Sequence, residues 1–318
     1  MVSADAAAPA NAPLVLCAGI AVLDQVYHVD RFPVAQAKTR AGAFATVIGG
    51  CAANAALAIA RLGGRTRLAA PLGGPAGEDP IGDRILAGLV REGVDCADTV
   101  RVAGATSPIS AILIDAAGDR AIVNHRDDGL AVAKVDDPAR LVADVAAVVI
   151  DNRFPEFVLP IASAARRRGV PVVLDGDAPT RETDALLAAS SHVVFSAEGL
   201  SATAGSGDLA AALDRIARRT RAFLAVTDGA NDVLFIDAGR VRRMPVFAVD
   251  AIDTLGAGDV FHGALALALA QGRDEVDAMR FSAAAAGIKC TRFGGGSGAP
   301  TRAEVDAFLA ARRRASAS

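Results

Sequence analysis

Aromatic side chains are scarce in this sequence of 318 residues: they make up 4% of it, with no tryptophan and one tyrosine. A hydrophobic core must therefore be built mainly from alanine, valine, leucine and isoleucine, and abundant alanine favours helices. Lysine is also scarce and occurs only at positions 38, 134 and 289. The formal net charge is −3, which implies no general affinity for nucleic acid.

Features that would define several other protein classes are missing. The four cysteines show no Cys-x-x-Cys spacing, so we expect reduced and mostly buried thiols. No run of about 18 uninterrupted apolar residues occurs, which predicts that no segment spans a membrane. Residues 1–13 lack the basic start and apolar segment of a signal peptide. We interpret them as a disordered tail and expect a cytoplasmic protein.

Two common nucleotide-binding signatures are absent as well. An NAD-dependent enzyme would need Gly-x-Gly-x-x-Gly after its first strand, and residues 19–24 (GIAVLD) lack the second glycine. The chain also has no Gly-x₄-Gly-Lys-Ser/Thr motif. Any phosphate binding must therefore use another arrangement.

The most informative stretch is Asp253–Asp259, with the sequence DTLGAGD. Gly256, Ala257 and Gly258 leave almost no side chain at a turn before a predicted helix over residues 260–271. Consecutive amides at a helix start, together with the positive end of its dipole, can form an anion site. Asp259 could simply cap this helix. It could also accept a proton from a hydroxyl that attacks a phosphoryl group held by the amides.

A second glycine motif, Gly49-Gly50, opens another predicted helix that carries Asn54 on its first turn. Two glycines before a helix allow the backbone to approach a ligand closely, and the Asn54 amide could contact that ligand. Asp24 follows a first predicted strand at residues 14–18. Taken alone, Asp24 could be an ordinary turn residue.

From about residue 138, short apolar strands alternate with helical patterns, which predicts βαβ units around a parallel sheet. Ligands of such sheets bind at the carboxyl ends of the strands. Residues 25–48 and 109–124 look instead like strands of a small lid over the site. We predict one α/β domain over residues 14–318, with a mostly parallel central sheet flanked by helices and carrying this β-sheet lid. A capping-box pattern at Thr301 and Glu304 predicts the start of the last helix.

Followed by VFHGA at residues 260–264, the DTLGAGD string resembles the C-terminal signature of the ribokinase-like sugar kinases, the PfkB family. The Gly-Gly/Asn motif resembles the N-terminal signature of that family, so the resemblance extends over nearly the whole chain. It implies ATP-dependent phosphorylation of a sugar, with Asp259 as the base and the amides of residues 256–258 stabilising the transferred charge. It also implies that Asp24, Gly49, Gly50 and Asn54 contact the sugar.

The resemblance further implies where ATP and its Mg²⁺ bind. Ser196 stands where the family has the asparagine of an Asn-x-x-Glu motif, and Glu198 could contact Mg²⁺ through water. Thr227 and Gly229 match a Thr-x-Gly on the nucleotide side, for which an ordinary Asp-Gly turn is an equal alternative.

Two further positions follow from the same resemblance. Gly287 and Cys290 flank the expected position of the adenine. Asp253, with the backbone near residues 294–297, matches the place where family members hold a monovalent cation such as K⁺.

Three residues bear on the identity of the sugar: Lys38 in the lid, Asn124 at the end of the lid hairpin, and Arg153 beyond a strand. We expect all three to face the cavity. A neutral hexose needs no cations there, whereas a sugar with an anionic group at C6 does. The stretches VVLDGD at residues 172–177, Phe195-Ser196 and KCTR at residues 289–292 look like the sulfofructose kinase branch, in which a Lys/Asn/Arg set holds a sulfonate. This predicts 6-deoxy-6-sulfofructose, phosphorylated at O1; if these cations are only solvated surface charges, the substrate is fructose, ribose or another sugar.

Two expectations concern the protein as a whole. A catalytically silent sugar-binding protein on the same fold is the alternative to a kinase. We also expect a homodimer formed through the lid, because a small sheet has exposed edges and little core of its own.

Overall fold

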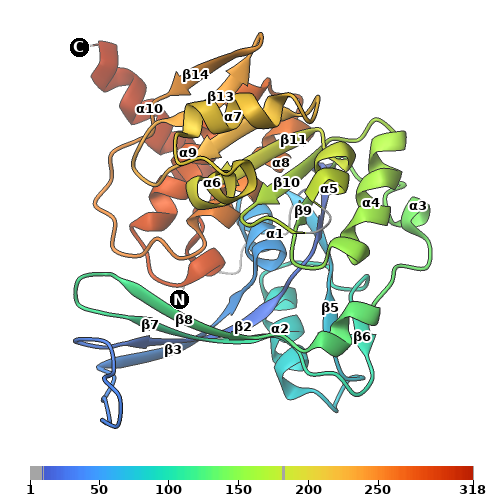
Figure 1. Cartoon of the computed structure of the whole chain (residues 1–318), viewed down its shortest axis with the longest axis vertical. Helices are drawn as coiled ribbons and strands as arrows, with labels where there is room; N and C mark the ends of the chain where they lie inside the picture. The colour runs from blue at the N-terminus through green and yellow to red at the C-terminus, as the bar shows by residue number, and fades with distance from the viewer. Residues whose placement is uncertain (1–8, 10, 181–182, 318) are drawn as a thin grey trace.

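The computed structural model describes residues 9, 11–180 and 183–317, and an eight-stranded sheet forms the centre of this part of the chain (Figure 1). From edge to edge its strands are β14 (Arg240–Met244), β13 (Val233–Asp237), β12 (Phe223–Thr227), β11 (His192–Ser196), β10 (Val172–Gly176), β9 (Ala147–Asp151), β1 (Leu14–Ala18) and β4 (Arg65–Ala69). The strands from β12 to β4 run parallel, whereas β13 and β14 pair antiparallel. The carboxyl ends of the parallel strands therefore meet along one edge, where ligands of such sheets bind.

Helices cover both faces of this sheet, because alternate residues of each strand point to opposite sides. In β1, Val15 and Cys17 pack with one set of helices, and Leu14 and Leu16 with the other. The first set is α1 (Cys51–Arg61), α8 (Ala257–Ala270), α9 (Glu275–Cys290) and α10 (Arg302–Ala317). The second set is α3 (Pro138–Leu141), α4 (Pro155–Arg167), α5 (Thr183–Ala189), α6 (Ala197–Ala204) and α7 (Leu209–Ala217).

A separate four-stranded sheet, which we call the lid, extends beside α2 in Figure 1. Its order is β3 (Ala43–Gly49), β2 (Val22–His28), β7 (Ile109–Ile114) and β8 (Arg120–His125). On its inner face, Val26 and Ile112 pack with Leu255 of the DTLGAGD string. Its outer face carries Phe44 and Val123, which are 57% and 69% exposed. The remaining elements are α2 (Pro80–Arg91), β5 (Pro71–Gly73), β6 (Val100–Val102), and the 3₁₀ turns η1 (Asp128–Val132) and η2 (Gly295–Gly298).

The predicted architecture is confirmed, with its mostly parallel sheet, flanking helices and small separate sheet. The capping box is also present: the Thr301 amide donates to Glu304 Oε2 at 2.7 Å, and the Glu304 amide donates to Thr301 Oγ1 at 3.4 Å. Helix α8 begins at Ala257, three residues before the predicted start, because the glycine turn leads directly into it. The predicted tail at residues 1–13 lies mostly outside the described residues. Within the described part of the chain, no helix is long and apolar enough to cross a membrane.

Candidate active site

Six of the predicted site residues line one cavity of about 590 Å³ between the lid and the carboxyl ends of the sheet. Such a volume suits a small-molecule ligand. The apolar part of its wall includes Ile112 and Ile122 of the lid and Leu255. The six residues are Asp24, Gly50, Asn54, Asn124, Arg153 and Asp259.

The glycine turn before α8 has the geometry of an anion site. Gly256 has a φ of 75°, in the left-handed region that favours glycine, and a Cβ there would lie 3.2 Å from the carbonyl carbon of Gly295. The Ala257 amide donates to Thr254 O at 3.2 Å, so it is already used within the turn. The amides of Gly256 and Gly258 make no hydrogen bond within the described part of the chain. They are the two amides that an incoming anion can use.

Asp259 lies on the first turn of α8, and its carboxylate is held by Asn54. The Asn54 side-chain amide donates to Asp259 Oδ2 at 2.7 Å, and Asn54 Oδ1 accepts from the Gly296 amide at 3.0 Å. Asn54 is only 3% exposed. These contacts use one N–H of the Asn54 amide, and the predicted sugar contact of Asn54 stays a prediction. The position of Asn54 orients the Asp259 carboxylate toward the cavity that both residues line.

Gly49 makes room for the Asp24 carboxylate, and Gly50 makes room for the backbone of Ile20. A Cβ at Gly49 would lie 1.8 Å from Asp24 Oδ2, and one at Gly50 would lie 2.6 Å from Ile20 O. Burial raises the pKa of Asp24 to about 6, although its hydrogen bond with Ser110 favours the ionised form. Gly49 therefore lets β3 close on Asp24, and Gly50 lets the start of α1 pack against the backbone at Ile20.

Asp151, at the end of β9, fixes the floor of the cavity. Its Oδ2 accepts from the amides of Ile20 at 2.7 Å and Ala52 at 3.3 Å, and its Oδ1 accepts from the Arg153 amide at 2.9 Å. One buried carboxylate thus joins the end of β1, the start of α1 and the turn that carries Arg153.

Two arginines line the cavity as well. Arg153, as predicted, lines the cavity, and its guanidinium forms an ion pair with Asp177. Arg126 was not predicted; it lines the same cavity, donates to Arg153 O, and lies 5.2 Å from the centre of the Phe154 ring. Its position two residues after Asn124, just beyond β8, was the available sequence signal.

Lys38 was predicted to face the cavity, and the structure places it elsewhere. It is exposed in the loop between β2 and β3 and is not among the residues that line the cavity. Asn124, by contrast, does line it, and its side-chain amide donates to Ser110 Oγ at 3.3 Å. Within the described part of the chain, Arg126 and Arg153 are therefore the lysine or arginine residues that line this cavity.

Behind the base lies a buried imidazole. His262 Nδ1 is 2.7 Å from Gly258 O, and Nε2 is 3.1 Å from Val194 O. Carbonyls only accept hydrogen bonds, so both ring nitrogens donate when His262 is protonated. Burial alone would lower the pKa of His262, but the Asp175 carboxylate and these carbonyls raise it above its ordinary value. The imidazolium anchors the first turn of α8 to β11 and balances the charge of Asp175.

Cys51 also lines the cavity, and its sulfur lies within 4.8 Å of carboxylate oxygens of Asp175 and Asp259. Burial raises the pKa of Cys51 well above its ordinary value, and the neighbouring carboxylates raise it further. The thiol therefore stays protonated at neutral pH. A protonated thiol is a poor metal ligand and a poor nucleophile.

The residues predicted on the nucleotide side lie at the ends of neighbouring strands. Ser196 ends β11 and Thr227 ends β12, and they are register partners. Ser196 Oγ accepts from the Gly199 amide at 2.9 Å and so caps α6, while Glu198 is exposed on its first turn. The remaining predicted residues are Gly229, in the turn after β12, and Gly287 and Cys290 on α9. None of these lines the 590 Å³ cavity.

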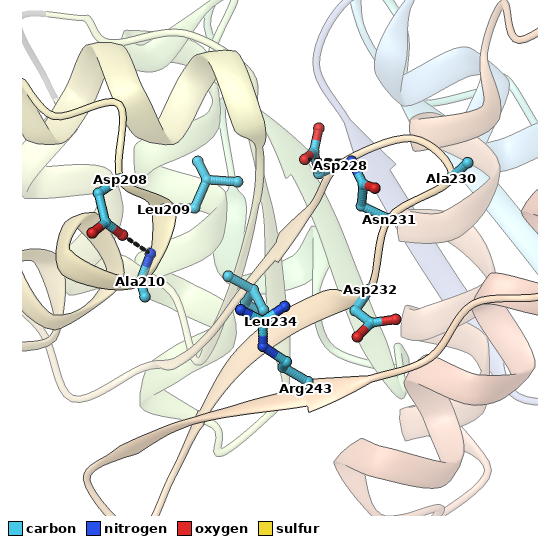
Figure 2. A pocket seen from close by; sticks show the side chains of 9 residues that line it. All are labelled: Asp208, Leu209, Ala210, Asp228, Ala230, Asn231, Asp232, Leu234 and Arg243. Atoms are coloured by element: carbon cyan, nitrogen blue, oxygen red, sulfur yellow. Dashed lines mark hydrogen bonds between the residues drawn. The ribbon is translucent and has the colours of Figure 1, made fainter.

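A second cavity, of about 460 Å³, lies between the start of α7 and the turn that joins β12 to β13 (Figure 2). Asp208, Asp228 and Asp232 line it, opposed by Arg243. Asp208 caps α7 by accepting from the amides of Ala210 and Ala211. With three carboxylates and one cation, this cavity is a poor match for a polyphosphate.

The predicted cation site at Asp253 does not fit an added monovalent ion. The Lys289 ammonium donates to Asp253 O at 2.8 Å and lies 3.3 Å from Asp253 Oδ2. Asp253 Oδ2 also accepts from the Gly294 amide at 3.0 Å. The carbonyl and carboxylate oxygens that such an ion would use are therefore already engaged by a positive charge.

Known proteins match nearly the whole chain. The model of a family described as pfkB family carbohydrate kinase matches residues 12–302. The ribokinase of Bacillus subtilis strain 168 is 29% identical over 295 residues, which cover 92% of this chain and 97% of that protein. The ATP-dependent ribose-1-phosphate kinase of Halopiger xanaduensis is 30% identical over 314 residues, which cover 94% and 98%.

Solved structures agree with the sequence comparisons. A crystal structure of a candidate ribokinase from Agrobacterium tumefaciens is 37% identical, with a TM-score of 0.90 over 95% of this chain and 99% of that one. Arabidopsis thaliana ribokinase in complex with ribose and ATP, at 23% identity and a TM-score of 0.80, shares the fold. The matched region contains both glycine motifs and the cavity between them, and the chain therefore belongs to the pfkB family of carbohydrate kinases.

Proposed function

We propose that this carbohydrate kinase transfers the γ-phosphate of ATP to O1 of a ketose that carries an anionic group at C6, with 6-deoxy-6-sulfofructose as the best candidate. One observation carries the proposal: Arg126 and Arg153 line the same cavity as Asp24 and Asp259. Guanidinium groups bind sulfonate or phosphate oxygens through paired hydrogen bonds. In this proposal the arginines hold the anionic end of the sugar, and O1 lies at Asp259.

In this proposal each residue has a defined part in the reaction. The ionised Asp24 carboxylate accepts hydrogen bonds from sugar hydroxyls, and Asn124 adds a second polar contact. Asp259, oriented by Asn54, accepts the proton of the attacking hydroxyl. The amides of Gly256 and Gly258 bind the oxygens of the transferred phosphate, where charge develops in the transition state.

ATP is proposed to lie along the strand ends that carry Ser196 and Thr227, with Gly229, Gly287 and Cys290 around its base. Mg²⁺ accompanying ATP would neutralise phosphate charge when bound. Glu198 is exposed on the first turn of α6 at the same strand ends, and its carboxylate suits water-mediated contact with Mg²⁺. The relative from Halopiger xanaduensis is named for a sugar that already carries an anionic phosphate, which supports such substrates within the family.

The second candidate is a neutral sugar such as ribose or fructose. The ion pair between Arg153 and Asp177 favours it, because Asp177 already neutralises one of the two arginines. Several curated relatives are named ribokinase, and one from Zea mays is named fructokinase. On this reading, the arginines maintain the shape of the cavity and contribute no anion specificity.

Steady-state kinetics of Arg126→Ala and Arg153→Ala with 6-deoxy-6-sulfofructose and with fructose separate the two candidates. Loss of the partner of a bound anion costs about 2–5 kcal/mol. We therefore expect kcat/KM for the sulfonated sugar to fall at least about tenfold, with little change for fructose. Arg84→Ala, at an exposed arginine of α2 outside the cavity, is the matched control. Equal losses on both sugars, or a wild-type preference for fructose, would leave the neutral sugar as the substrate.

A further inference from the structure

Lys289 is a fully buried lysine on the last turn of α9, and its ammonium points at the start of the DTLGAGD string. Its relative exposure is 0%. Asp253 supplies the two oxygens nearest to the ammonium: the carbonyl at 2.8 Å and carboxylate Oδ2 at 3.3 Å. A lysine is almost never fully buried unless it is paired. The ion pair with Asp253 therefore accounts for the burial of Lys289.

Through Asp253, the ammonium acts on both segments that form the anion site. Asp253 Oδ1 accepts from the Leu255 amide at 2.8 Å, which sets the turn leading to Gly256. Asp253 Oδ2 accepts from the Gly294 amide at 3.0 Å, which begins the glycine-rich turn η2. That turn packs directly behind Gly256, because a Cβ at Gly256 would lie 3.2 Å from Gly295.

The same glycine-rich turn is also tied to the proposed base. The amide of Gly296 donates to Asn54 Oδ1, and Asn54 donates to Asp259. Lys289 and Asp259 thus lie at opposite ends of one hydrogen-bonded chain that passes behind the two free amides. A change in the position of Asp253 would shift the phosphate-binding amides and the carboxylate together.

We propose that the Lys289 ammonium is an internal cation that positions the anion site, so that this kinase works without an added monovalent cation. An external ion bound to the same oxygens would lie against the ammonium in a buried setting, where like charges repel strongly. The inference rests on the proposed phosphate site at Gly256 and Gly258. Asp259→Asn tests the proposed reaction beside these amides in buffers without K⁺, so a failure of the proposed function can be told from a failure of the cation proposal.

The first experiment uses the wild-type protein. Phosphorylation of 6-deoxy-6-sulfofructose and of fructose is measured while choline chloride is replaced stepwise by KCl, up to about 100 mM at constant ionic strength. The melting temperature is measured in the same buffers without substrates. We expect kcat, both KM values and the melting temperature to be unchanged by K⁺. Activation at least about tenfold, or a K⁺-specific rise in melting temperature, would overturn the proposal.

The second experiment removes the internal cation. In Lys289→Met, which keeps the length of the side chain, we expect kcat in choline buffer to fall at least about tenfold. K⁺ or NH₄⁺ should restore part of it, because the vacated oxygens can then bind an ion. Lys134→Met, at an exposed lysine, is the control and should match the wild type in every buffer.

The effect of K⁺ on kcat of Lys289→Met distinguishes a lysine that positions the anion site from one that only stabilises the fold. A structural lysine would lower the melting temperature of Lys289→Met but leave kcat of the folded protein intact and insensitive to K⁺, and that result would overturn the proposal. Lys289→Gln, which keeps a hydrogen-bond donor without the charge, replaces Lys289→Met if the latter does not fold. The wild-type titration decides the cation requirement whatever the variants do.

Discussion

At the scale of single residues, the candidate site depends on a short contact between two side chains that are 205 positions apart in the sequence. Asn54 donates to Asp259 Oδ2 at 2.7 Å, and both residues line the cavity. A base must lie within hydrogen-bond reach of the proton it removes, so its orientation matters as much as its pKa. Asn54 supplies that orientation from the first turn of a different helix.

Replacing the base tests this arrangement directly. We expect Asp259→Asn to lower kcat by about 10²–10⁴, the usual contribution of a general base, while sugar and ATP still bind. The amide side chain keeps the shape of the site but cannot take the proton. Kinetics together with equilibrium binding of each substrate check the prediction. Turnover near the wild-type rate would remove Asp259 from the mechanism.

Asp24 predicts a pH dependence of sugar binding. Its pKa is raised by burial to about 6, so the free protein carries a growing fraction of neutral Asp24 as the pH falls below that value. A neutral carboxyl group has lost part of its capacity to accept hydrogen bonds from sugar hydroxyls. We therefore expect KM for the sugar to rise as the pH decreases from about 7 to about 5, while KM for ATP changes little.

Asp24→Asn is the control for this pH profile. It removes the titrating group, so its KM for the sugar, although higher, should be flat over the same range. This variant also separates Asp24 from Asp175, whose pKa burial likewise raises to about 6. A wild-type KM for the sugar that stays constant down to about pH 5 would contradict the assignment of Asp24 as a hydrogen-bond acceptor for the substrate.

At the scale of helices and strands, the position of Asn54 relative to Asp259 depends on how closely α1 and α8 approach. Gly263 of α8 faces Ala55 of α1, and a Cβ there would lie 2.6 Å from Ala55 O. We expect Gly263→Ala to destabilise the fold by about 1–3 kcal/mol, because overpacking forces the two helices apart. Denaturant unfolding measures this loss, and kcat should fall with it as Asn54 moves away from Asp259.

Gly207 provides the matched control. It lies in an exposed loop, and a Cβ there would meet nothing within 4 Å. Gly207→Ala should therefore leave stability unchanged or raise it slightly, because alanine restricts the unfolded chain. Equal effects of the two substitutions would show that helix packing at Gly263 is not the cause.

Much of this organisation could be predicted from local patterns. Alternating apolar strands and helices indicated the parallel sheet, and the two glycine motifs indicated the helix starts that face the cavity. Helix α9 was missed because it is buried on nearly every side, including Ala283, Ala284 and Ala285, and therefore shows no amphipathic period. The apolar segment at residues 245–249 reads as extended, yet forms no strand.

Within the site, the features that the sequence did not predict are contacts between residues far apart in the chain. The structure brings four predicted residues to one cavity, and each follows a recognisable strand or motif in the sequence: Asp24, Asn124, Arg153 and Asp259. The pairing of Lys289 with Asp253 joins residues 36 positions apart, and no spacing rule encodes it. Lys38 was placed wrongly because a loop between lid strands has no periodicity to fix the direction of its side chain.

At the scale of the whole molecule, the lid presents an apolar outer face that a second copy of the chain can cover. The rings of Tyr27 and Phe44 lie 4.9 Å apart on that face, and Phe44 and Val123 are largely exposed. We expect a homodimer at about micromolar concentration by light scattering. Phe44→Glu should shift it toward monomer, because burial of a carboxylate in an apolar interface is unfavourable.

Val132→Glu is the control for this prediction, since Val132 is also largely exposed but lies outside the lid. It should leave the oligomeric state unchanged. A wild-type monomer at the same concentration would contradict a dimer formed through the lid.

The order of strands in the central sheet has a consequence for how copies of the chain can aggregate. Its two edge strands are rich in arginine: β14 carries Arg240, Arg242 and Arg243, and β4 carries Arg65 and Arg67. At β4 the edge is already bridged to Asp95, and Arg67 pairs with Asp98 and Asp144. At β14 a strand from another molecule would have to pack against exposed guanidinium groups, which discourages fibre-like growth. The lid edge β3 has no charged side chain. Strand addition between molecules is therefore expected at the edge of the lid and not at the edges of the central sheet.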